Sequence, residues 1–295
     1  MVRGVYLRKI RDAENRSRAV RDDFARNLYV NGWDGSDSND GLSWEKSFAT
    51  MAKAFSVVTD GATIYLAGRV QEQITAPQDV FDVKIIGTHN RPRHGTADGV
   101  QQGYPAQWNP LVTGTATPNL TLREQGWTIE NILFDAPDAA ACVKLSRTEL
   151  AAAMDASHAT FRNCRFVGGG TGIEDAGGHF NVLVENCIFQ SLTNGITCSS
   201  TSIAVPLQWQ ILNNEFNQNT NDIISSYNFS TIRKNIFHSA EPVINTVYNS
   251  AQGSYNAVVE NYINDAVADY KGTVTGSATD IWVNYGTDAQ GFGHS

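Results

Sequence analysis

The chain has 295 residues, of which 41% are hydrophobic, and a formal net charge of −8. This acidic balance excludes general affinity for nucleic acid as a main role, and no apolar run approaches the length that spans a membrane. The 25 glycines, together with many Asn and Thr residues, are typical of a β protein rich in turns.

The N-terminal segment differs from the rest of the chain in charge. Residues 1–28 hold eight basic residues against four acidic ones, a net charge of +4, so the remainder carries −12. Apolar or small residues spaced three and four apart predict one stripe of a helix. They are Ile10, Ala13, Ser17, Val20 and Phe24. The segment has no apolar core of the signal-peptide type, so export by that route is not expected.

Three roles fit this segment: a solvated helix packed on its own domain, a self-associating stem, or an arm that attaches the protein to a larger assembly. The stripe is short and weakened by Ala13 and Ser17, so it is not expected to hold oligomers together by itself. We assign residues 1–27 to a helical attachment arm. Its expected contact residues are Arg8, Arg11, Arg18, Arg21 and Phe24.

The next stretch resembles the opening of a known superfamily. From Leu28 the sequence is LYVNGWDGSDSNDGLSWEKSFATMAKAFSVVTDGATIYLAG, an Asp- and Gly-rich turn followed by a helical segment at 47–58 and strands at 62–66 and 83–87. It resembles the start of the pectate-lyase-like right-handed β-helix superfamily, in which such a helix caps the coils. The resemblance implies an all-β fold, a right-handed parallel β-helix over residues 28–264. It does not imply an activity, because this scaffold serves polysaccharide lyases, hydrolases, adhesins and bacteriophage spikes alike.

A six-residue pattern, apolar-x-Asn-x-x-Phe, recurs through the middle of the chain. It occurs at 129–134, 161–166, 184–189 and 211–216, decays at 232–237, where Lys234 replaces Asn, and leaves only Asn261 at 259–264. The Phe residues are 32, 23, 27 and 21 positions apart, which is typical of a solenoid with insertions of different length. Asn suits a bend because it tolerates the left-handed backbone region.

A second apolar marker follows four of these Phe residues at a constant distance of seven positions. It comprises Ile173, Ile196, Ile223 and Ile244. Each coil therefore has at least two strands, and we expect columns of Phe and Ile to fill the core. Residues 265–295 leave the repeat and are predicted to form a β hairpin that caps the last coil.

The four cysteines predict a reducing compartment. Cys164 and Cys187 both follow the bend Asn of their coils and are expected to stack in the core as free thiols. Cys142 and Cys198 have no evident pairing partner. No Cys or His spacing suggests zinc, and a plain turn is favoured over a calcium site at Asp34, Asp37 and Asp40. We expect no metal and no cofactor.

Charged residues occupy the position between the first apolar residue and Asn of each repeat. The column is Glu130, Arg162, Glu185, Leu212, Arg233 and Glu260. Alternating sign predicts a solvated salt ladder. The best acidic cluster is Glu174 and Asp175, with Arg165 as a neighbour, and it is the alternative for a catalytic site. We favour no catalytic residues.

The insertion from Thr88 to Asn119 carries aromatic and basic residues, namely Arg91, Arg93, Tyr104 and Trp108. Long loops on a solenoid are usually functional or contact a neighbour, so these residues are candidates for glycan or subunit contact. Packing over the side of the solenoid is the alternative.

These observations together predict a non-enzymatic bacteriophage virion protein, a head decoration, fibre or tailspike component, assembled in the host cytoplasm. Its expected partners are capsid or tail proteins, further copies in a homotrimer, and a polysaccharide, with no nucleic acid and no membrane insertion. A polysaccharide lyase or glycoside hydrolase, such as a tailspike depolymerase, is the alternative, and a bacterial adhesin is a third class.

Overall fold

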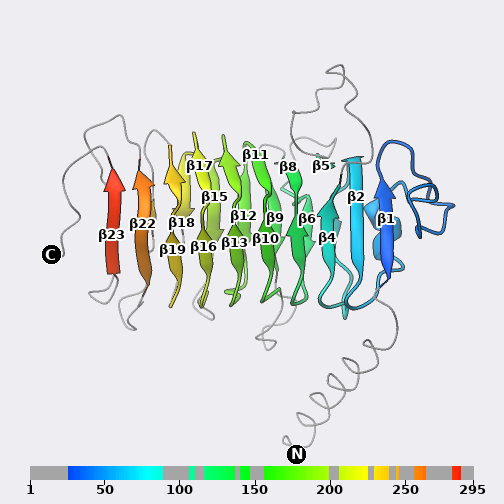
Figure 1. Cartoon of the computed structure of the whole chain (residues 1–295), viewed down its shortest axis with the longest axis horizontal. Helices are drawn as coiled ribbons and strands as arrows, with labels where there is room; N and C mark the ends of the chain where they lie inside the picture. The colour runs from blue at the N-terminus through cyan, green and yellow to red at the C-terminus, as the bar shows by residue number, and fades with distance from the viewer. Residues whose placement is uncertain are drawn as a thin grey trace, which may run out of the picture.

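The chain forms an all-β solenoid whose strands coil around one long axis (Figure 1). The computed structural model describes residues 26–88, 106–109, 116–136, 140–146, 156–198, 206–224, 229–238, 244–245, 256–263 and 281–286. Equivalent strands of successive coils pair in parallel, as Phe161 does with Ile129 on one side and Val184 on the other. The fold is a right-handed parallel β-helix, as the resemblance implied.

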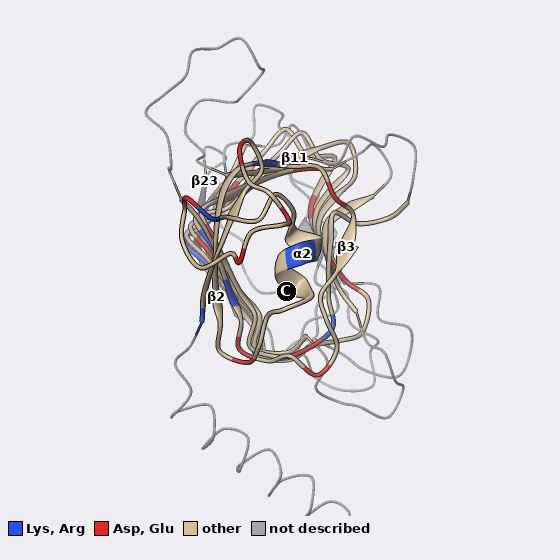
Figure 2. Ribbon diagram, turned by 90° about the vertical axis from the view of Figure 1, so that its right-hand side faces the viewer, with Lys and Arg blue, Asp and Glu red and all other residues tan. Residues whose placement is uncertain are grey.

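Three faces of parallel strands make up each coil, seen end-on in Figure 2. The first face consists of β1 (Asn27–Asn31), β2 (Thr63–Val70), β4 (Lys84–Gly87), β7 (Thr128–Glu130), β10 (Thr160–Arg162), β13 (Leu183–Glu185), β16 (Gln210–Leu212), β19 (Thr231–Arg233) and β22 (Ala257–Ile263). The second consists of β5 (Ala106–Trp108), β8 (Ile132–Ala136), β11 (Arg165–Gly168), β14 (Ile188–Gln190), β17 (Glu215–Asn217) and β20 (Ile236–Phe237), and the last residues of β2 and β22 bend onto this face. The third consists of β3 (Ile74–Thr75), β6 (Leu120–Leu122), β9 (Ala141–Leu145), β12 (Thr171–Asp175), β15 (Asn194–Cys198), β18 (Asn221–Ile224) and β21 (Ile244–Asn245).

The bend between the first and second faces is made by the Asn of the repeat. Asn131, Asn163, Asn186 and Asn213 have φ between 51° and 60°, and Lys234 takes the same conformation with φ 56°. Asn reaches this left-handed region at low cost, so the repeat encodes a corner of the coil. The prediction of a bend at these positions is confirmed.

The core is a stack of aromatic rings flanked by a column of isoleucines. Neighbouring rings lie nearly parallel, with centroid separations of 5.5, 4.8, 4.8 and 4.9 Å along Phe134, Phe166, Phe189, Phe216 and Phe237. On the third face, the predicted isoleucine column is also in register from coil to coil. Each ring fills the space beside the ring of the next coil, so no coil can bury its apolar face without its neighbours.

A short helix, α2 (Met51–Phe55), lies across the N-terminal end of the coils, where Figure 2 shows it inside their outline. Thr50 caps its first turn through a bond from the Lys53 amide to the Thr50 hydroxyl, and Met51, Ala54 and Phe55 are buried. The helix covers apolar core that the first coil would otherwise expose. It lies within the predicted segment 47–58 but is shorter.

The C-terminal strand covers the edge of the last coil. β23 (Ile281–Gly286) pairs in parallel with β22 and continues the solenoid, while the rest of the predicted hairpin at 265–295 lies outside the described residues. The first face therefore extends beyond residue 264. Within the described ranges, no helix has the length and apolar content that crossing a membrane requires.

Candidate functional site

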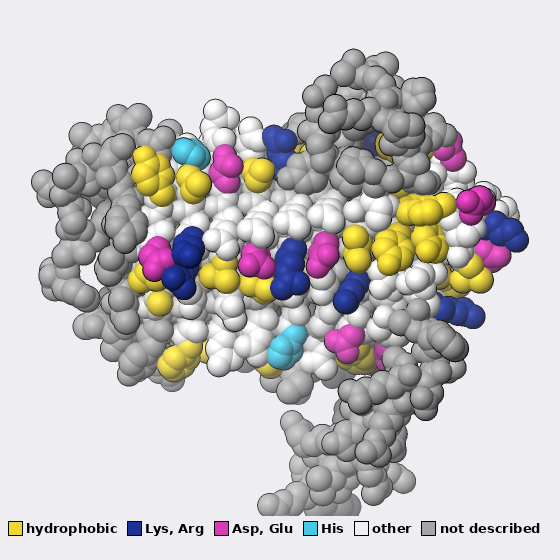
Figure 3. Space-filling model, viewed as in Figure 1, with side chains coloured by type: hydrophobic (Ala, Val, Ile, Leu, Met, Phe, Trp, Pro, Cys, Tyr) yellow, Lys and Arg dark blue, Asp and Glu magenta, His cyan; other side chains and the backbone are white. Residues whose placement is uncertain are grey.

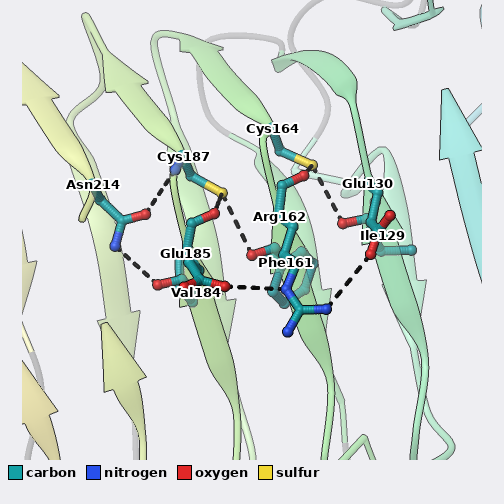
Figure 4. A network of polar contacts seen from close by, with 9 residues as sticks. All are labelled: Ile129, Glu130, Phe161, Arg162, Cys164, Val184, Glu185, Cys187 and Asn214. Carbon is teal, nitrogen blue, oxygen red and sulfur yellow. Dashed lines mark hydrogen bonds and ion pairs between the residues drawn. The ribbon is translucent and has the colours of Figure 1, made fainter. Parts of the chain in front are cut away.

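A row of outward-pointing charged side chains runs along the first face, over β7, β10 and β13 (Figure 4). Glu130, Arg162 and Glu185 are register partners in three successive coils. The Arg162 guanidinium lies 3.1 Å from the nearer Glu185 oxygen and 3.7 Å from Glu130. The three side chains neutralise one another in part and remain half-buried or exposed, which fits the predicted salt ladder.

The last member of that predicted column was placed one residue out of register. Val259, not Glu260, is the partner of Arg233. Glu260 forms the corner instead, with φ 57°, and from there its carboxylate lies 2.9 Å from Arg233. The corner of this coil thus lacks Asn, and Asn261 takes the position that follows the corner.

The position after the corner forms a buried ladder that Figure 4 shows in part. Asn214 donates a side-chain bond to the Val184 carbonyl at 2.9 Å, and the Cys187 thiol lies 3.6 Å from the equivalent carbonyl, that of Phe161. Cys164 contacts the Ile129 carbonyl in the same way at 3.5 Å. Thiols and amides therefore occupy one column, in which Cys164 and Cys187 are followed by Asn214, Asn235 and Asn261.

All four cysteines are free thiols, and Cys142, Cys164 and Cys187 are buried. Burial raises the pKa of the Cys142 thiol, and it raises that of Cys187 well above the usual range, with neighbouring Cys164 adding to the shift. A protonated, enclosed thiol is a poor nucleophile and a poor metal ligand. These thiols serve the core, as the sequence indicated for Cys164 and Cys187.

The acidic cluster of the catalytic alternative does not converge on one site. Glu174 points outward from β12 and lies 3.2 Å from Lys144 of the neighbouring coil. Asp175, the next residue along the strand, is fully buried. Arg165 belongs to β11 on a different face, where its guanidinium donates to Gln190. Adjacent strand residues point to opposite sides, so the two carboxylates cannot act on one substrate from this strand.

The buried Asp175 is the centre of a polar cluster that the sequence alone did not reveal. Its carboxylate accepts hydrogen bonds from the backbone amides of Gly177, Gly178 and His179 at 2.9, 2.9 and 3.1 Å. The His179 Nδ1 lies 2.6 Å from the same carboxylate, and the Cys198 thiol lies 3.5 Å from it. The four-residue spacing of Asp and His around two glycines was the available signal. The cluster fixes the turn after β12.

The acidic turn before α2 is also used structurally. Asp37 accepts bonds from the amides of Ala49 and Thr50 and from the Thr50 hydroxyl, at 2.9, 3.0 and 2.8 Å. Asp40 lies 3.7 Å from Lys46. Across the described residues, no group of three His, Cys, Asp or Glu side chains is arranged to hold a metal ion.

Glu72 provides a second cap for α2. Its carboxylate accepts the Met51 and Ala52 amides at 2.6 and 2.9 Å, which satisfies two donors of the first helical turn. Burial is the main cause that raises the pKa of Glu72, and the two amide bonds oppose this shift.

Trp108 does not lie where a glycan contact was expected. It is fully buried, stacks on Phe134 with a centroid separation of 5.7 Å and donates its indole N–H to the Glu72 carbonyl at 2.8 Å. It thus extends the ring stack by one coil, which corrects its assignment as an exposed aromatic. Arg91, Arg93 and Tyr104 lie outside the described residues, as do Arg8, Arg11, Arg18, Arg21 and Phe24.

A half-buried carboxylate lies next to Trp108 on the second face. The Asn109 side chain donates to Asp135 at 3.0 Å, and the backbone carbonyl of Asp135 accepts from Asn119 at 3.1 Å. Burial raises the pKa of Asp135, while the charge of Arg69 opposes that shift. The carboxylate of Asp135 is thus held by Asn109, a residue of the insertion.

The carboxylates of Glu130, Glu174, Glu185 and Asp175 thus take part in contacts between coils and in the turn after β12.

Comparison with protein families agrees with the architecture. Residues 122–263 match the family model described as right handed beta helix region. No curated protein matches the chain. Among solved structures, a pectin methylesterase from Aspergillus niger is 12% identical with a TM-score of 0.44, covering 90% of this chain and 92% of that chain.

Two further solved structures come from other functional classes. A GH136 lacto-N-biosidase from Eubacterium ramulus is 10% identical, with a TM-score of 0.42 and coverage of 96% of this chain and 70% of that one. A tailspike protein of the Acinetobacter baumannii bacteriophage Fri1, a capsular polysaccharide depolymerase, is 12% identical, with a TM-score of 0.34 and coverage of 81% and 55%. Such low identities and scores say nothing about the activity of this chain.

Proposed function

We propose that this chain is a non-enzymatic structural protein of a bacteriophage particle, a head decoration, fibre or spike component that presents its β-helix outward. The proposal rests on one observation: the candidate catalytic carboxylates are engaged in ion pairs and backbone hydrogen bonds. Glu174 is paired with Lys144, Asp175 is buried against backbone amides, and Glu130 and Glu185 flank Arg162. A hydrolase or lyase needs such groups converging on one exposed point.

The charge distribution supports attachment through the N-terminal segment. Residues 1–28 carry +4 and the remainder −12, so this arm is suited to docking on an acidic site of a capsid or tail protein. The four free thiols fit assembly in a host cytoplasm followed by incorporation into the virion.

A homotrimer about the long axis is the oligomer that we propose, because a narrow solenoid gains burial between copies when several pack side by side. The coil flanks and the insertion at 88–119 would supply that interface. A host polysaccharide is the ligand that we propose for the outward faces.

Particle attachment provides the test. We expect a variant lacking residues 1–27 to fold and oligomerise as the full chain does but to be absent from purified particles. A full-length variant with Arg8, Arg11, Arg18 and Arg21 changed to Gln isolates the contribution of charge. It keeps the apolar residues of the predicted helix and removes the net positive charge of residues 1–28. It should attach more weakly, and wild-type attachment should weaken as salt rises. Normal incorporation of the truncated protein, or its isolation as a monomer, would refute the arm.

Catalysis is tested with the full chain on bacterial capsule, pectin and alginate. We expect neither new reducing ends nor unsaturated-uronate absorbance. Turnover that is abolished by Glu174→Gln or Asp175→Asn would replace the structural proposal by the depolymerase alternative.

A further inference from the structure

Aromatic side chains gather on the outward side of the first face, at the N-terminal end of the solenoid, where Figure 3 shows hydrophobic groups over β1 and β2. Tyr29 and Tyr65 are register partners whose rings stack with centroids 5.3 Å apart. Trp44 packs edge-on against Tyr29 at 5.0 Å. Trp33 follows β1 and is 45% exposed. These four residues are named the aromatic patch.

The Trp33 indole packs against the backbone at Gly68. A Cβ at residue 68 would come within 2.9 Å of the Trp33 indole, and the φ of Gly68 is +80°. The backbone of β2 at Gly68, where the strand bends onto the second face, therefore supports the indole on one side, and the ring keeps an exposed surface. Rings fixed in this way bind a ligand at little cost in side-chain entropy.

The aromatic patch continues directly into the charged row. In the register of the first face, Tyr65 is followed by Ile86, and Ile86 by Glu130, so one file of side chains runs from the rings to Arg162 and Glu185 at steps of about 4.8 Å. The same file crosses the middle of the face in Figure 3.

The file has balanced charge. Glu130 and Glu185 are offset by Arg162 and by the exposed Lys84, which precedes Ile86 by two residues on β4 and so lies on the same side. A strongly anionic or cationic ligand gains nothing from such a surface. Hydroxyl groups, in contrast, can donate to the carboxylates and accept from the guanidinium without displacing the ion pairs.

We propose that this file is a binding site for a neutral glycan, which deepens the proposed function by naming the site and class of its polysaccharide ligand. The apolar C–H side of a pyranose ring would lie on the aromatic patch, and the hydroxyls of the following units would bond to Glu130, Arg162 and Glu185. A protein partner fits less well, because covering the charged row with apolar surface would desolvate ion pairs at a cost.

Calorimetric titration of the full chain with cello-, malto- and chito-oligosaccharides, and with oligogalacturonate as the anionic comparison, tests the site. We expect binding of at least one neutral series and none of oligogalacturonate. Trp33→Ala should weaken that binding by about twofold to tenfold, the loss expected for one aromatic contact. Tyr262→Ala is the matched control, since its side chain is 43% exposed near the other end of the solenoid and should leave binding unchanged.

Three results would overturn the site: no binding by any neutral series, tighter binding of oligogalacturonate, or an equal loss in the Tyr262→Ala protein. A shift in oligomeric state or in particle attachment on Trp33→Ala would instead identify the aromatic patch as a protein contact, which also overturns it. Failure here is separable from failure of the virion role, because the full-length variant with Arg8, Arg11, Arg18 and Arg21 changed to Gln tests attachment and leaves β1, which carries Tyr29, intact.

Discussion

Removing one rung of the asparagine ladder should destabilise the whole solenoid. Asn235 is fully buried, and its side chain makes four hydrogen bonds. Its oxygen accepts from the Asn214 amide at 2.8 Å and from the Asn214 side chain at 3.0 Å. Its nitrogen donates to the Ile211 carbonyl and to the Asn261 side chain, both at 2.9 Å. Asn235→Ala deletes all four bonds without adding bulk.

The expected loss in the free energy of unfolding depends on which hydrogen bonds the partners of Asn235 keep. The Asn214 side chain keeps its bond to Val184, and the Asn261 oxygen keeps the Asn235 amide. The Asn214 backbone amide loses its partner, whereas the Ile211 carbonyl lies in β16, which stays paired with β19. A buried polar group left unpaired costs about 1–3 kcal/mol, so the free energy of unfolding should fall by an amount in that range. That is a large share of the roughly 5–15 kcal/mol that stabilises a typical domain.

Urea unfolding followed by far-ultraviolet circular dichroism measures this change. Gln210→Ala is the control, because Gln210 is exposed in the coil that contains Asn214 and its truncation should change stability by less than about 0.5 kcal/mol. Cys187→Asn provides the inverse test. An amide there can repeat the bond of Asn214 one coil earlier, so this variant should fold and be no less stable than wild type. An Asn235→Ala protein as stable as the Gln210→Ala protein would refute the ladder argument.

Three further outcomes are expected. Phe189→Ala, which removes a ring stacked on both sides, should lower the free energy of unfolding by about 3–5 kcal/mol in the same assay, and a cost near that of an exposed truncation would count against the ring stack. The raised pKa of Asp135 means that the folded state binds its proton more readily than the unfolded chain. The stability that the protonated Asp135 carboxyl contributes is therefore present at low pH. It is lost as the pH rises from the pKa of Asp135 in the unfolded chain through its higher pKa in the folded protein. Asp135→Asn should flatten this part of the pH profile, and an unchanged slope would contradict the assignment. All four thiols should titrate in denaturant without reductant, whereas in the native protein the buried ones should react slowly; a Cys164–Cys187 bridge found by mass spectrometry would disprove cytoplasmic assembly.

The sequence alone determined the features that depend on one residue type at one local conformation. Asn131 and its equivalents mark corners because Asn tolerates positive φ, and the Phe and Ile columns follow because parallel coils place like residues side by side. The bend Asn, the Phe and the Ile recur in successive coils, so the repeat could be recognised although the coils differ in length. The helical segment at 47–58 and the strands at 62–66 and 83–87 came instead from the resemblance to the superfamily, and α2, β2 and β4 lie at these places.

Only the tertiary structure decided which side a residue faces where the pattern breaks. The shift of the corner to Glu260 depends on strand pairing with Arg233, and a local motif cannot report a slip of one residue. Asp175 and Trp108 looked like surface groups because polarity and loop context suggested it. Their burial depends on the His179 turn and on the Phe134 ring supplied by a neighbouring coil. Likewise, Tyr29 and Tyr65 lie 36 residues apart in the sequence and become one stacked pair only through the parallel register of β1 and β2.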